Sequence, residues 1–405
     1  MASMLHAAKY RTKQTTTPIA PTDLAFLQSE TGEKLLADLA GEDLSEKHAL
    51  KLITTLRKMY SQEQVSAALT MAKLRLKAVH KFGPDASQLF FTDDALQQAS
   101  DPLVRQYRAQ NIEGKRILDV CSSIGADSLA FAQAGAIVQG LDIDPVRIAI
   151  ARHNAHKLVC DATFTMVDVT QGIADDYDLI FFDPARRDKH GKRIYNVEGY
   201  IPPLSLIEKW HAPQIMVKLA PSVDISQITK YGGEVQFISV NGDMKEAVLH
   251  VDGNTGLTAV LLSHDAVNIW HRQDKEPDVP ITEPQGWLCE PDPSILRAKL
   301  VKDIAYEYRG AMLDETIAYF TTAEKPNSVW IRAWQIIDWM PFNLKKLRAY
   351  LRSRNMGTIT VKKRGSPITP EELIRKLKLT GDNACTLVLT QYNREPIVLL
   401  CHNFI

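Results

Sequence analysis

Residues 117–132 have the sequence ILDVCSSIGADSLAFA, in which a short apolar run leads through a loop of small residues into a helical pattern. This order brings backbone N–H groups at a helix N-terminus within reach of a ligand. The G-x-G-x-x-G pattern of dinucleotide-binding loops is absent, and so is the G-x-x-x-x-G-K-[ST] pattern of triphosphate-binding loops. The stretch therefore predicts the ligand-binding turn of an α/β domain outside these two classes.

Similar apolar runs, rich in β-branched residues, alternate with helical patterns on the C-terminal side. This alternation predicts βαβ units and a buried parallel sheet with right-handed crossovers. Asn241-Gly242-Asp243 is a hairpin turn signal, so we expect an antiparallel edge. The expected strands are RILDV (116–120), AIVQGLDI (136–143), ATFTMVDV (162–169), DLIFFD (178–183), QIMVKLA (214–220), EVQFISV (234–240), EAVLHV (246–251) and TAVLLS (258–263).

The chain divides into five segments by pattern and composition. We expect a flexible leader at 1–22, a helical domain at 23–110, the α/β domain at 111–265, a mixed helical connector at 266–325 and an α+β domain at 326–405. In the connector, both ILRAKLVKDIAYEY (295–308) and MLDETIAYFTT (312–322) have helical patterns. The last segment has the order β-α-β-α-β-β.

The composition of the 405 residues excludes several protein classes. The chain is 45% hydrophobic and 24% charged with zero net charge, which is ordinary for a globular protein. Its five cysteines lack zinc-site spacing and indicate no disulfide framework. No apolar run is long enough to span a membrane and no secretion signal is present, so we expect a cytoplasmic protein without a membrane partner.

Two acidic residues follow the second predicted strand. Asp142 lies 23 residues after Asp119, about where a carboxylate binds a ribose in doubly wound folds. The alternative for Asp142 is a plain carboxylate at the end of a strand. Asp144 precedes Pro145 and is expected to cap the next helix.

The succession LDVCSSIGAD (118–127), GLDIDP (140–145), TMVDVT (165–170) and DLIFFDPARR (178–187) resembles motifs I to IV of the class I S-adenosylmethionine-dependent methyltransferases. The resemblance implies an α/β, Rossmann-like sheet and S-adenosylmethionine as cofactor. It places Asp119 and Gly125 at the methionine half of the cofactor, Asp142 at the ribose and Asp168 at the adenine, with Cys121, Ser122, Ile143 and Val169 beside them. Motif I departs from the family pattern, because Cys121 and Ser123 replace two glycines where positive φ is comfortable.

The whole chain is similar to bacterial class I methyltransferases that carry a THUMP-like α+β domain at the C-terminal end. The segments that carry this resemblance are DPARRD (183–188), VKLAPS (217–222), FISVNGDMKEAVL (237–249), VKKRGSP (361–367) and LIRKLKLTGDNACTLVLT (373–390). THUMP domains are associated with RNA modification, so the resemblance implies an RNA substrate. Shared shape alone does not establish a substrate.

The candidate catalytic position follows the fourth strand, at Asp183 and Pro184. Amino-methyltransferases have [DN]-P-P-[YF] here, but this chain has Arg186 and Arg187 in place of the aromatic residue. The change favours an anionic group, such as phosphate, held by an arginine. Alternatively, both arginines are solvated in a loop. Tyr195 and Tyr200 are candidates for stacking on a base or for packing.

Lys218 ends the fifth strand and Glu246 follows the hairpin turn. With Asp183 they have the order of the last three members of the Lys-Asp-Lys-Glu tetrad of ribose 2′-O-methyltransferases, and Lys81 is a candidate for the first member. Such a lysine deprotonates a hydroxyl. The alternative is a structural salt bridge between Lys218 and one of the two carboxylates.

Residues 341–378 contain eleven Lys and Arg against two Glu, a net charge of +9. We define this stretch as the basic segment. Clustered cations of this kind are typical of RNA-backbone contacts, although a solvated helix face has the same composition. The candidate RNA-binding residues are Lys345, Arg348, Arg352, Lys362, Lys363 and Arg364. His153 and His156 have no third ligand nearby, so we expect no metal site.

The leading hypothesis is therefore an RNA methyltransferase acting on tRNA or rRNA, at a base or ribose atom that the sequence does not specify. The alternatives are a methyltransferase of a small molecule or protein, and a non-catalytic protein that binds S-adenosylmethionine. The sequence predicts no oligomeric state.

Overall fold

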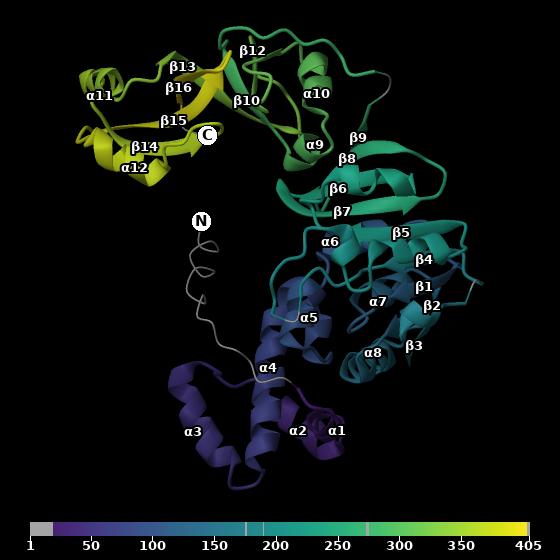
Figure 1. The fold of residues 1–405 in the computed structure, drawn as a ribbon. Helices are drawn as coiled ribbons and strands as arrows, with labels where there is room; N and C mark the ends of the chain where they lie inside the picture. The colour runs from purple at the N-terminus through teal and green to yellow at the C-terminus, as the bar shows by residue number, and fades with distance from the viewer. Residues whose placement is uncertain (1–18, 175, 189, 273–274, 403–405) are drawn as a thin grey trace. The chain divides into compact units, whose positions relative to one another are not determined.

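The structure, a computed structural model, describes residues 19–174, 176–188, 190–272 and 275–402 (Figure 1). The chain forms two compact units that meet in sequence between Lys218 and Leu219. Most of the predicted leader lies outside the described residues, and the first helix begins at Pro21. Within the described residues, no helix has the length and apolar character needed to cross a membrane.

The first unit begins with helices, as predicted for residues 23–110. Their buried faces form one core with residues of the following α/β part, among them Ile124 and Ile150. Thr92 accepts a hydrogen bond from Ala95 N–H and so caps a helix, because Thr is a favourable N-cap residue. The helices are α1 (Pro21–Leu27), α2 (Glu30–Leu39), α3 (Glu46–Leu56), α4 (Gln62–Phe82), α5 (Asp93–Gln98) and α6 (Pro102–Arg108), with the 3-10 turn η2 (Gly83–Ser87) after α4.

Five parallel strands follow, in the order β3-β2-β1-β4-β5. Leu129, Ile148 and Phe164 pack together and join the two crossover helices to the sheet. The elements are β1 (Arg116–Val120), α7 (Ala126–Gln133), β2 (Ile137–Asp142), α8 (Pro145–Leu158), β3 (Ala162–Met166), β4 (Leu179–Phe182) and β5 (Gln214–Leu219), with 3-10 turns η3 (Val169–Gln171), η4 (Val197–Gly199) and η5 (Leu204–Lys209).

The second unit opens with four strands in the order β7-β6-β8-β9. The predicted hairpin is present, because β6 and β7 are antiparallel around Asn241 and Gly242, while β6 and β8 are parallel. The fold class is thus confirmed, with all eight predicted strands. The bounds are β6 (Glu234–Val240), β7 (Asp243–Val251), β8 (Gly256–Leu262) and β9 (Val267–His271), preceded by the 3-10 turns η6 (Ile225–Gln227) and η7 (Thr229–Tyr231).

The rest of the second unit is built on a seven-stranded sheet with the order β11-β12-β10-β13-β16-β15-β14. Only the β14–β15 pair is parallel among the pairings of the described strands of this sheet. The elements are β10 (Trp287–Pro291), α9 (Pro293–Arg297), α10 (Val301–Glu307), β11 (Ala311–Met312), β12 (Phe320–Thr322), β13 (Ile331–Pro341), α11 (Leu344–Ser353), β14 (Met356–Lys363), α12 (Pro370–Leu377), β15 (Asn383–Tyr392) and β16 (Glu395–Cys401).

The predicted connector, 266–325, differs from the structure. The helical prediction for 312–322 is wrong, because this stretch contains β12, and β10 to β12 join the same sheet as the C-terminal strands. Asp314 turns the chain by accepting a hydrogen bond from Thr316 N–H and another from Arg394 N–H, far along the sequence. A short apolar run does not distinguish helix from strand, and this long-range contact is invisible to local pattern.

Candidate functional site

The carboxyl ends of the parallel strands of the first unit meet at one edge of the sheet. Asp183 N–H donates to Val120 O at 3.2 Å, and Ser122 N–H donates to Leu141 O at 2.9 Å, which brings the ends of β4, β1 and β2 together. In the register, the aligned row is Leu141, Val120, Phe182 and Val217. The residues that follow this row are therefore neighbours, and they are Asp142, Cys121, Asp183 and Lys218. Four predicted site positions thus lie side by side.

The loop after β1 has three residues with positive φ, at Cys121 (66°), Ser123 (53°) and Gly125 (82°). The structure therefore keeps the left-handed backbone that glycine would favour, although a non-glycine residue costs roughly 1–2 kcal/mol there. At Gly125 a Cβ would lie 3.0 Å from the Phe164 ring, so the close packing of β3 also requires glycine. Burial and the nearby charges of Asp142, Asp183 and Asp119 raise the pKa of the Cys121 thiol, which keeps it protonated and unreactive.

Asp119 lies at the base of this loop and is 1% exposed. Ser128, on the first turns of α7, donates a hydrogen bond to its Oδ2. Burial raises the pKa of Asp119 to about 8; the Ser128 bond opposes the shift, and the charges of Asp127 and Asp183 add to it. Asp119 Oδ1 and Ser122 Oγ are buried and have no hydrogen-bond partner among the described residues.

Asp142 connects two loops through its carboxylate. Ser123 N–H donates to Oδ2 and Asp144 N–H donates to Oδ1, both at 2.9 Å. Burial raises the pKa of Asp142, although these two bonds and the charge of Arg147 oppose the shift. Asp144 accepts from Val146 N–H at 2.8 Å, so its predicted role as the N-cap of α8 is confirmed.

The remaining cofactor candidates follow β2 and β3: Ile143 comes directly after β2, and Asp168 and Val169 come after β3. Ile143 is a large apolar residue that is nevertheless 67% exposed, whereas Val169 is buried. Asp168 accepts bonds from Thr170 N–H at 3.0 Å and Thr170 Oγ1 at 2.6 Å. The Thr170 hydroxyl bond is the largest cause of the lowered pKa of Asp168.

Lys218 and Asp183 form an ion pair, with Nζ 2.7 Å from Oδ2. The lysine side chain is 3% exposed and the aspartate side chain 24%, so the carboxylate is the accessible partner. Lys218 Nζ also donates to Gln98 O at 3.3 Å, at the end of α5. Glu246 lies in the second unit, buried on β7.

Lys81, the candidate first member of the tetrad, contacts backbone instead. Its Nζ donates to Leu96 O at 2.9 Å, to Gln97 O at 3.0 Å and to Ala99 O at 2.5 Å. These carbonyls are at the C-terminal end of α5, where a cation is favourable. Lys81 and Lys218 together therefore hold four successive carbonyls of residues 96–99.

A second buried ion pair, Arg108 with Asp127, was not predicted from the sequence. Both side chains are under 10% exposed, at 2% and 8%, and the guanidinium lies 4.5 Å from the centre of the Phe181 ring. Burial alone would raise the pKa of Asp127, but the charges of Arg108, Lys218 and Arg105 outweigh burial and keep it below its usual value. The pair joins α6 of the helical region to α7, directly after the loop.

The segment after Asp183 holds the remaining candidates of the first unit. Pro184 is buried, Arg186 is half-buried and Arg187 donates to Gly191 O at 2.9 Å. Tyr200 is buried and therefore packs, whereas Tyr195 is 67% exposed and available to a ligand.

The six candidate RNA-binding residues of the second unit differ in their contacts. Arg348 donates to Lys376 O, and Arg352 donates to Lys378 O at 3.0 Å. Both side chains therefore stabilise the C-terminal end of α12. Lys362 and Arg364 pair with Glu290 at 3.1 and 3.6 Å. Lys345 and Lys363 are exposed, and Lys363 Nζ reaches Ser366 O only at 3.5 Å.

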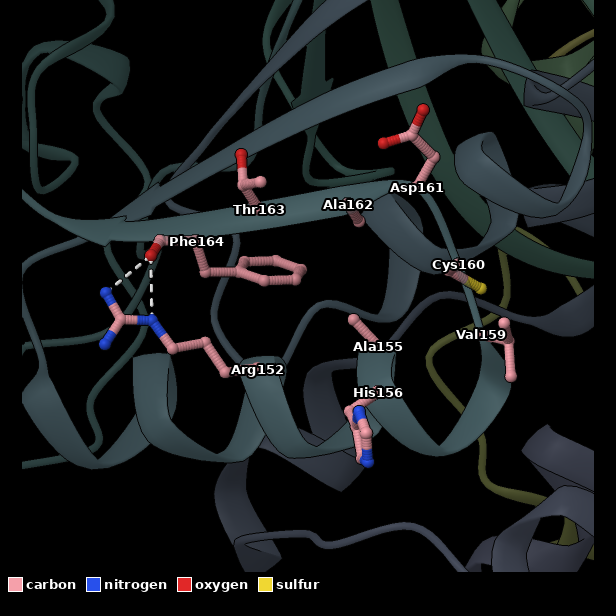
Figure 2. A pocket seen from close by; sticks show the side chains of 9 residues that line it. All are labelled: Arg152, Ala155, His156, Val159, Cys160, Asp161, Ala162, Thr163 and Phe164. Carbon is pink, nitrogen blue, oxygen red and sulfur yellow. Dashed lines mark hydrogen bonds between the residues drawn. The ribbon is translucent and has the colours of Figure 1, made fainter.

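A cavity of about 700 Å³ lies elsewhere in the first unit, between the end of α8 and the start of β3 (Figure 2). Arg152 lines it and donates to Phe164 O at 2.9 and 2.7 Å. Because β3 begins there, the cavity is at the edge of the sheet opposite to Asp142 and Asp183. His153 stacks on Phe90, and burial lowers its pKa to about 4. Among the described residues, no group of His, Cys, Asp and Glu side chains is arranged to hold a metal ion.

Comparison with known proteins bears on the family and the fold. Residues 331–403 match a family described as THUMP domain-like, and residues 20–78 match a domain of unknown function. A crystal structure from Porphyromonas gingivalis W83, named provisionally as a methyltransferase, has a TM-score of 0.74 at 20% identity and covers 91% of this chain and 98% of that one. It therefore shares the fold.

Relatives in sequence are more informative. A match of 30% identity over 105 residues to tRNA (uracil(54)-C(5))-methyltransferase of Pyrococcus horikoshii covers 26% of this chain and 25% of that enzyme. An uncharacterized S-adenosylmethionine-dependent methyltransferase of Mycobacterium tuberculosis is 32% identical over 332 residues, which covers 78% of this chain and 90% of the relative. At this identity and coverage, the chain belongs to the S-adenosylmethionine-dependent methyltransferases, and it carries a THUMP-like domain at its C-terminal end.

Proposed function

We propose that this methyltransferase acts on RNA, with tRNA or rRNA as the substrate. The observation that carries the proposal is the basic segment, which has a net charge of +9 and lies within the THUMP-like match. Among its exposed cations, Lys345 and Lys363 have no acidic partner among the described residues. Cations at such positions neutralise phosphates and release counterions, the main source of nucleic-acid affinity. The partial similarity to a tRNA methyltransferase supports the same substrate class.

The carboxyl edge of the sheet fits S-adenosylmethionine. The orphaned atoms Asp119 Oδ1 and Ser122 Oγ need a polar partner, since a buried unsatisfied group costs about 1–3 kcal/mol. We assign them to the methionine half, beside Cys121 and Gly125. Asp142 is assigned to the ribose hydroxyls, and the set at the adenine is Ile143, Asp168 and Val169. The cofactor supplies an electrophilic methyl group at this edge.

Asp183 is the residue best placed to orient the nucleophile. Its carboxylate is partly exposed, and the ion pair with buried Lys218 fixes one oxygen while leaving the other accessible. A carboxylate in this position accepts a hydrogen bond from an amine or a hydroxyl of the substrate. Pro184 stiffens the turn, and Arg186 is assigned to an anionic group of the substrate. Glu246 stays a candidate catalytic residue.

The test is transfer of a deuterated methyl group from S-adenosylmethionine to bulk tRNA or rRNA isolated from cells that lack the gene. We expect one methylated nucleoside with the wild type. Asp183→Asn keeps the size of the side chain and should lower turnover about 10²-fold or more. Lys209→Gln, at an exposed position on the 3-10 turn η5, is the control and should keep full turnover.

The alternative substrates have a distinct result in the same assay. If the deuterated methyl group enters no nucleoside but appears in a protein or a small molecule of a cell extract, the RNA proposal is wrong. In that case Lys345→Gln and Lys363→Gln will leave the apparent KM unchanged. An RNA substrate predicts a higher KM for the double variant at an unchanged kcat, because these cations bind substrate and transition state alike.

A further inference from the structure

The segment that follows Pro184 folds back on itself as a short hairpin. Ala185 and Ile201 exchange two backbone hydrogen bonds, of 2.9 and 3.0 Å, and Ile194 N–H donates to Arg186 O at 2.9 Å. Arg187 and Arg193 are paired across the two sides. We call residues 185–201 the basic hairpin. It begins two residues after Asp183, so it is attached directly to the candidate catalytic position.

The basic hairpin has an excess of positively charged residues. Its sequence contains five Lys and Arg against Asp188 and Glu198, whereas the chain outside the basic segment has an overall net charge of −9. The Asp188 carboxylate accepts hydrogen bonds from the backbone N–H groups of His190 and Lys192, both at 2.9 Å. The Asp188 carboxylate therefore stabilises the turn of the hairpin.

The pairing of Arg187 with Arg193 places two like charges opposite each other, although the Arg187 side chain also donates to Gly191 O at 2.9 Å within the turn. Like charges directly opposite on antiparallel strands destabilise the pair. In the part of the chain that the structure describes, neither arginine forms an ion pair with a carboxylate, and nor do Arg186 and Lys192. Some other surface cations of the same unit are paired, for example Arg147 with Asp94 at 2.5 Å and Lys157 with Glu33 at 2.6 Å, whereas isolated ones such as Lys47 and Lys51 on α3 form no ion pair among the described residues; the hairpin differs in that it gathers several such cations in one short segment. The hairpin cations are thus positioned for an external anion.

An exposed aromatic residue accompanies these cations. Tyr195 is 67% exposed on the returning side of the hairpin, two residues after Arg193. Val197 and Tyr200 are buried and anchor the base of the hairpin in the unit. Cations that follow a backbone, combined with an aromatic ring for a base, are the two components of a single-strand binding surface.

We propose that the basic hairpin binds the phosphodiester backbone of single-stranded RNA beside the target nucleotide, with Tyr195 stacked on a base. This inference rests on the proposed RNA substrate and adds a second contact surface, separate from the basic segment. Because the hairpin begins two residues after Asp183, its contacts determine which nucleotide reaches the catalytic position. The basic segment contributes affinity for RNA in general.

The first test measures binding of the full chain to a short single-stranded oligoribonucleotide over a range of salt concentrations. The double variant Arg187→Gln/Arg193→Gln should weaken binding and reduce the log–log salt slope by about 1.4, since each lost contact with a single strand removes about 0.7. Its melting temperature should change little, because the relieved repulsion offsets the loss of the exposed Arg187 bond to Gly191 O. Lys47→Gln/Lys51→Gln on α3 is the matched control and should keep the wild-type slope.

The second test separates stacking from charge. Tyr195→Ala should weaken binding about 5- to 150-fold with an unchanged salt slope, because the ring contributes no charge. Tyr195→Phe keeps the ring and should bind like the wild type. Affinity for S-adenosylmethionine, measured by calorimetry without RNA, should be the same in all variants.

The outcomes distinguish the hairpin from the proposed function. If the wild type binds the oligoribonucleotide and Lys345→Gln/Lys363→Gln weakens it, while both hairpin variants retain wild-type affinity and slope, the hairpin proposal is overturned and the RNA substrate stands. If the wild type binds no RNA and methylates none, both proposals are overturned. Weaker binding by Arg187→Gln/Arg193→Gln with an unchanged slope would also overturn the backbone contact.

Discussion

Asp119 is a buried carboxyl group whose charge state depends on pH in the physiological range. Burial raises its pKa to about 8, so in the absence of a ligand the folded protein holds it mostly protonated at neutral pH. The unfolded chain ionises the same group near pH 4. Folding and proton binding at Asp119 are therefore coupled.

The coupling predicts a pH-dependent effect of Asp119→Asn on stability. Since the folded pKa is raised above the unfolded value, the wild type loses stability as pH rises from about 4 to about 8, by at most about 1.4 kcal/mol per pH unit. The amide does not ionise, so the variant should gain stability relative to the wild type between pH 5 and pH 8. Urea unfolding without cofactor measures this difference, and a difference that is independent of pH would contradict the assignment.

Gly125 is the position in the loop after β1 where glycine is required most strictly. Its φ is 82°, and a Cβ would approach Phe164 Cζ to 3.0 Å. Gly125→Ala should therefore lower the free energy of unfolding by about 1–2 kcal/mol and weaken S-adenosylmethionine binding. Gly41→Ala is the control, because no atom lies within 4 Å of its added Cβ. Equal stability of the two variants in urea unfolding would contradict the argument.

Among the elements, α11 and α12 show that cations of the basic segment have two separate roles. Arg348 and Arg352 on α11 donate to carbonyls at the C-terminal end of α12, where the helix leaves orphan acceptors. Lys345, on the same helix, is exposed to solvent. The sequence spacing alone assigns all three to one face and one function.

Substitution separates the two roles. Arg352→Ala should lower the free energy of unfolding by about 0.5–1.5 kcal/mol, because it removes a hydrogen bond to a helix end. Lys345→Ala should leave stability unchanged within about 0.5 kcal/mol and reduce the salt slope of RNA binding. Urea unfolding and RNA binding are measured on both variants. A loss of stability in Lys345→Ala together with unchanged stability in Arg352→Ala would refute the assignment.

The sequence predicts strongly periodic elements well and contacts between distant elements poorly. The eight predicted strands, β1 to β8, follow from apolar runs, and the Asp144 cap follows from the Asp-Pro pair, whereas β9 (Val267–His271) was not predicted. β11 and β12 were missed because they are two and three residues long and depend on pairing with each other and with β10.

The candidate site shows the same division. The positions of Asp142 and Asp183 at strand ends can be predicted from the motifs, because strand ends align at one edge of the sheet. The Arg108–Asp127 pair could not be predicted, since it depends on how α6 packs against α7. Local sequence does carry one usable signal, because Arg105 and Arg108 are three residues apart and therefore lie on the same side of α6.

For the molecule as a whole, the zero net charge is the sum of two opposed regions. The basic segment carries +9 and the remaining residues carry −9. A polyanion is therefore attracted to the basic segment and, on average, repelled by the remaining residues. Within those remaining residues, the basic hairpin is the exception. Charge distribution rather than total charge agrees with an RNA substrate.

Whether this methyltransferase modifies RNA can be measured by mass spectrometry of nucleosides from tRNA and rRNA, in cells with and without the gene. We expect one methylated nucleoside to be lost without the gene, restored by the wild type and not restored by Asp183→Asn. An unchanged nucleoside profile in both RNA pools would show that RNA is not the substrate.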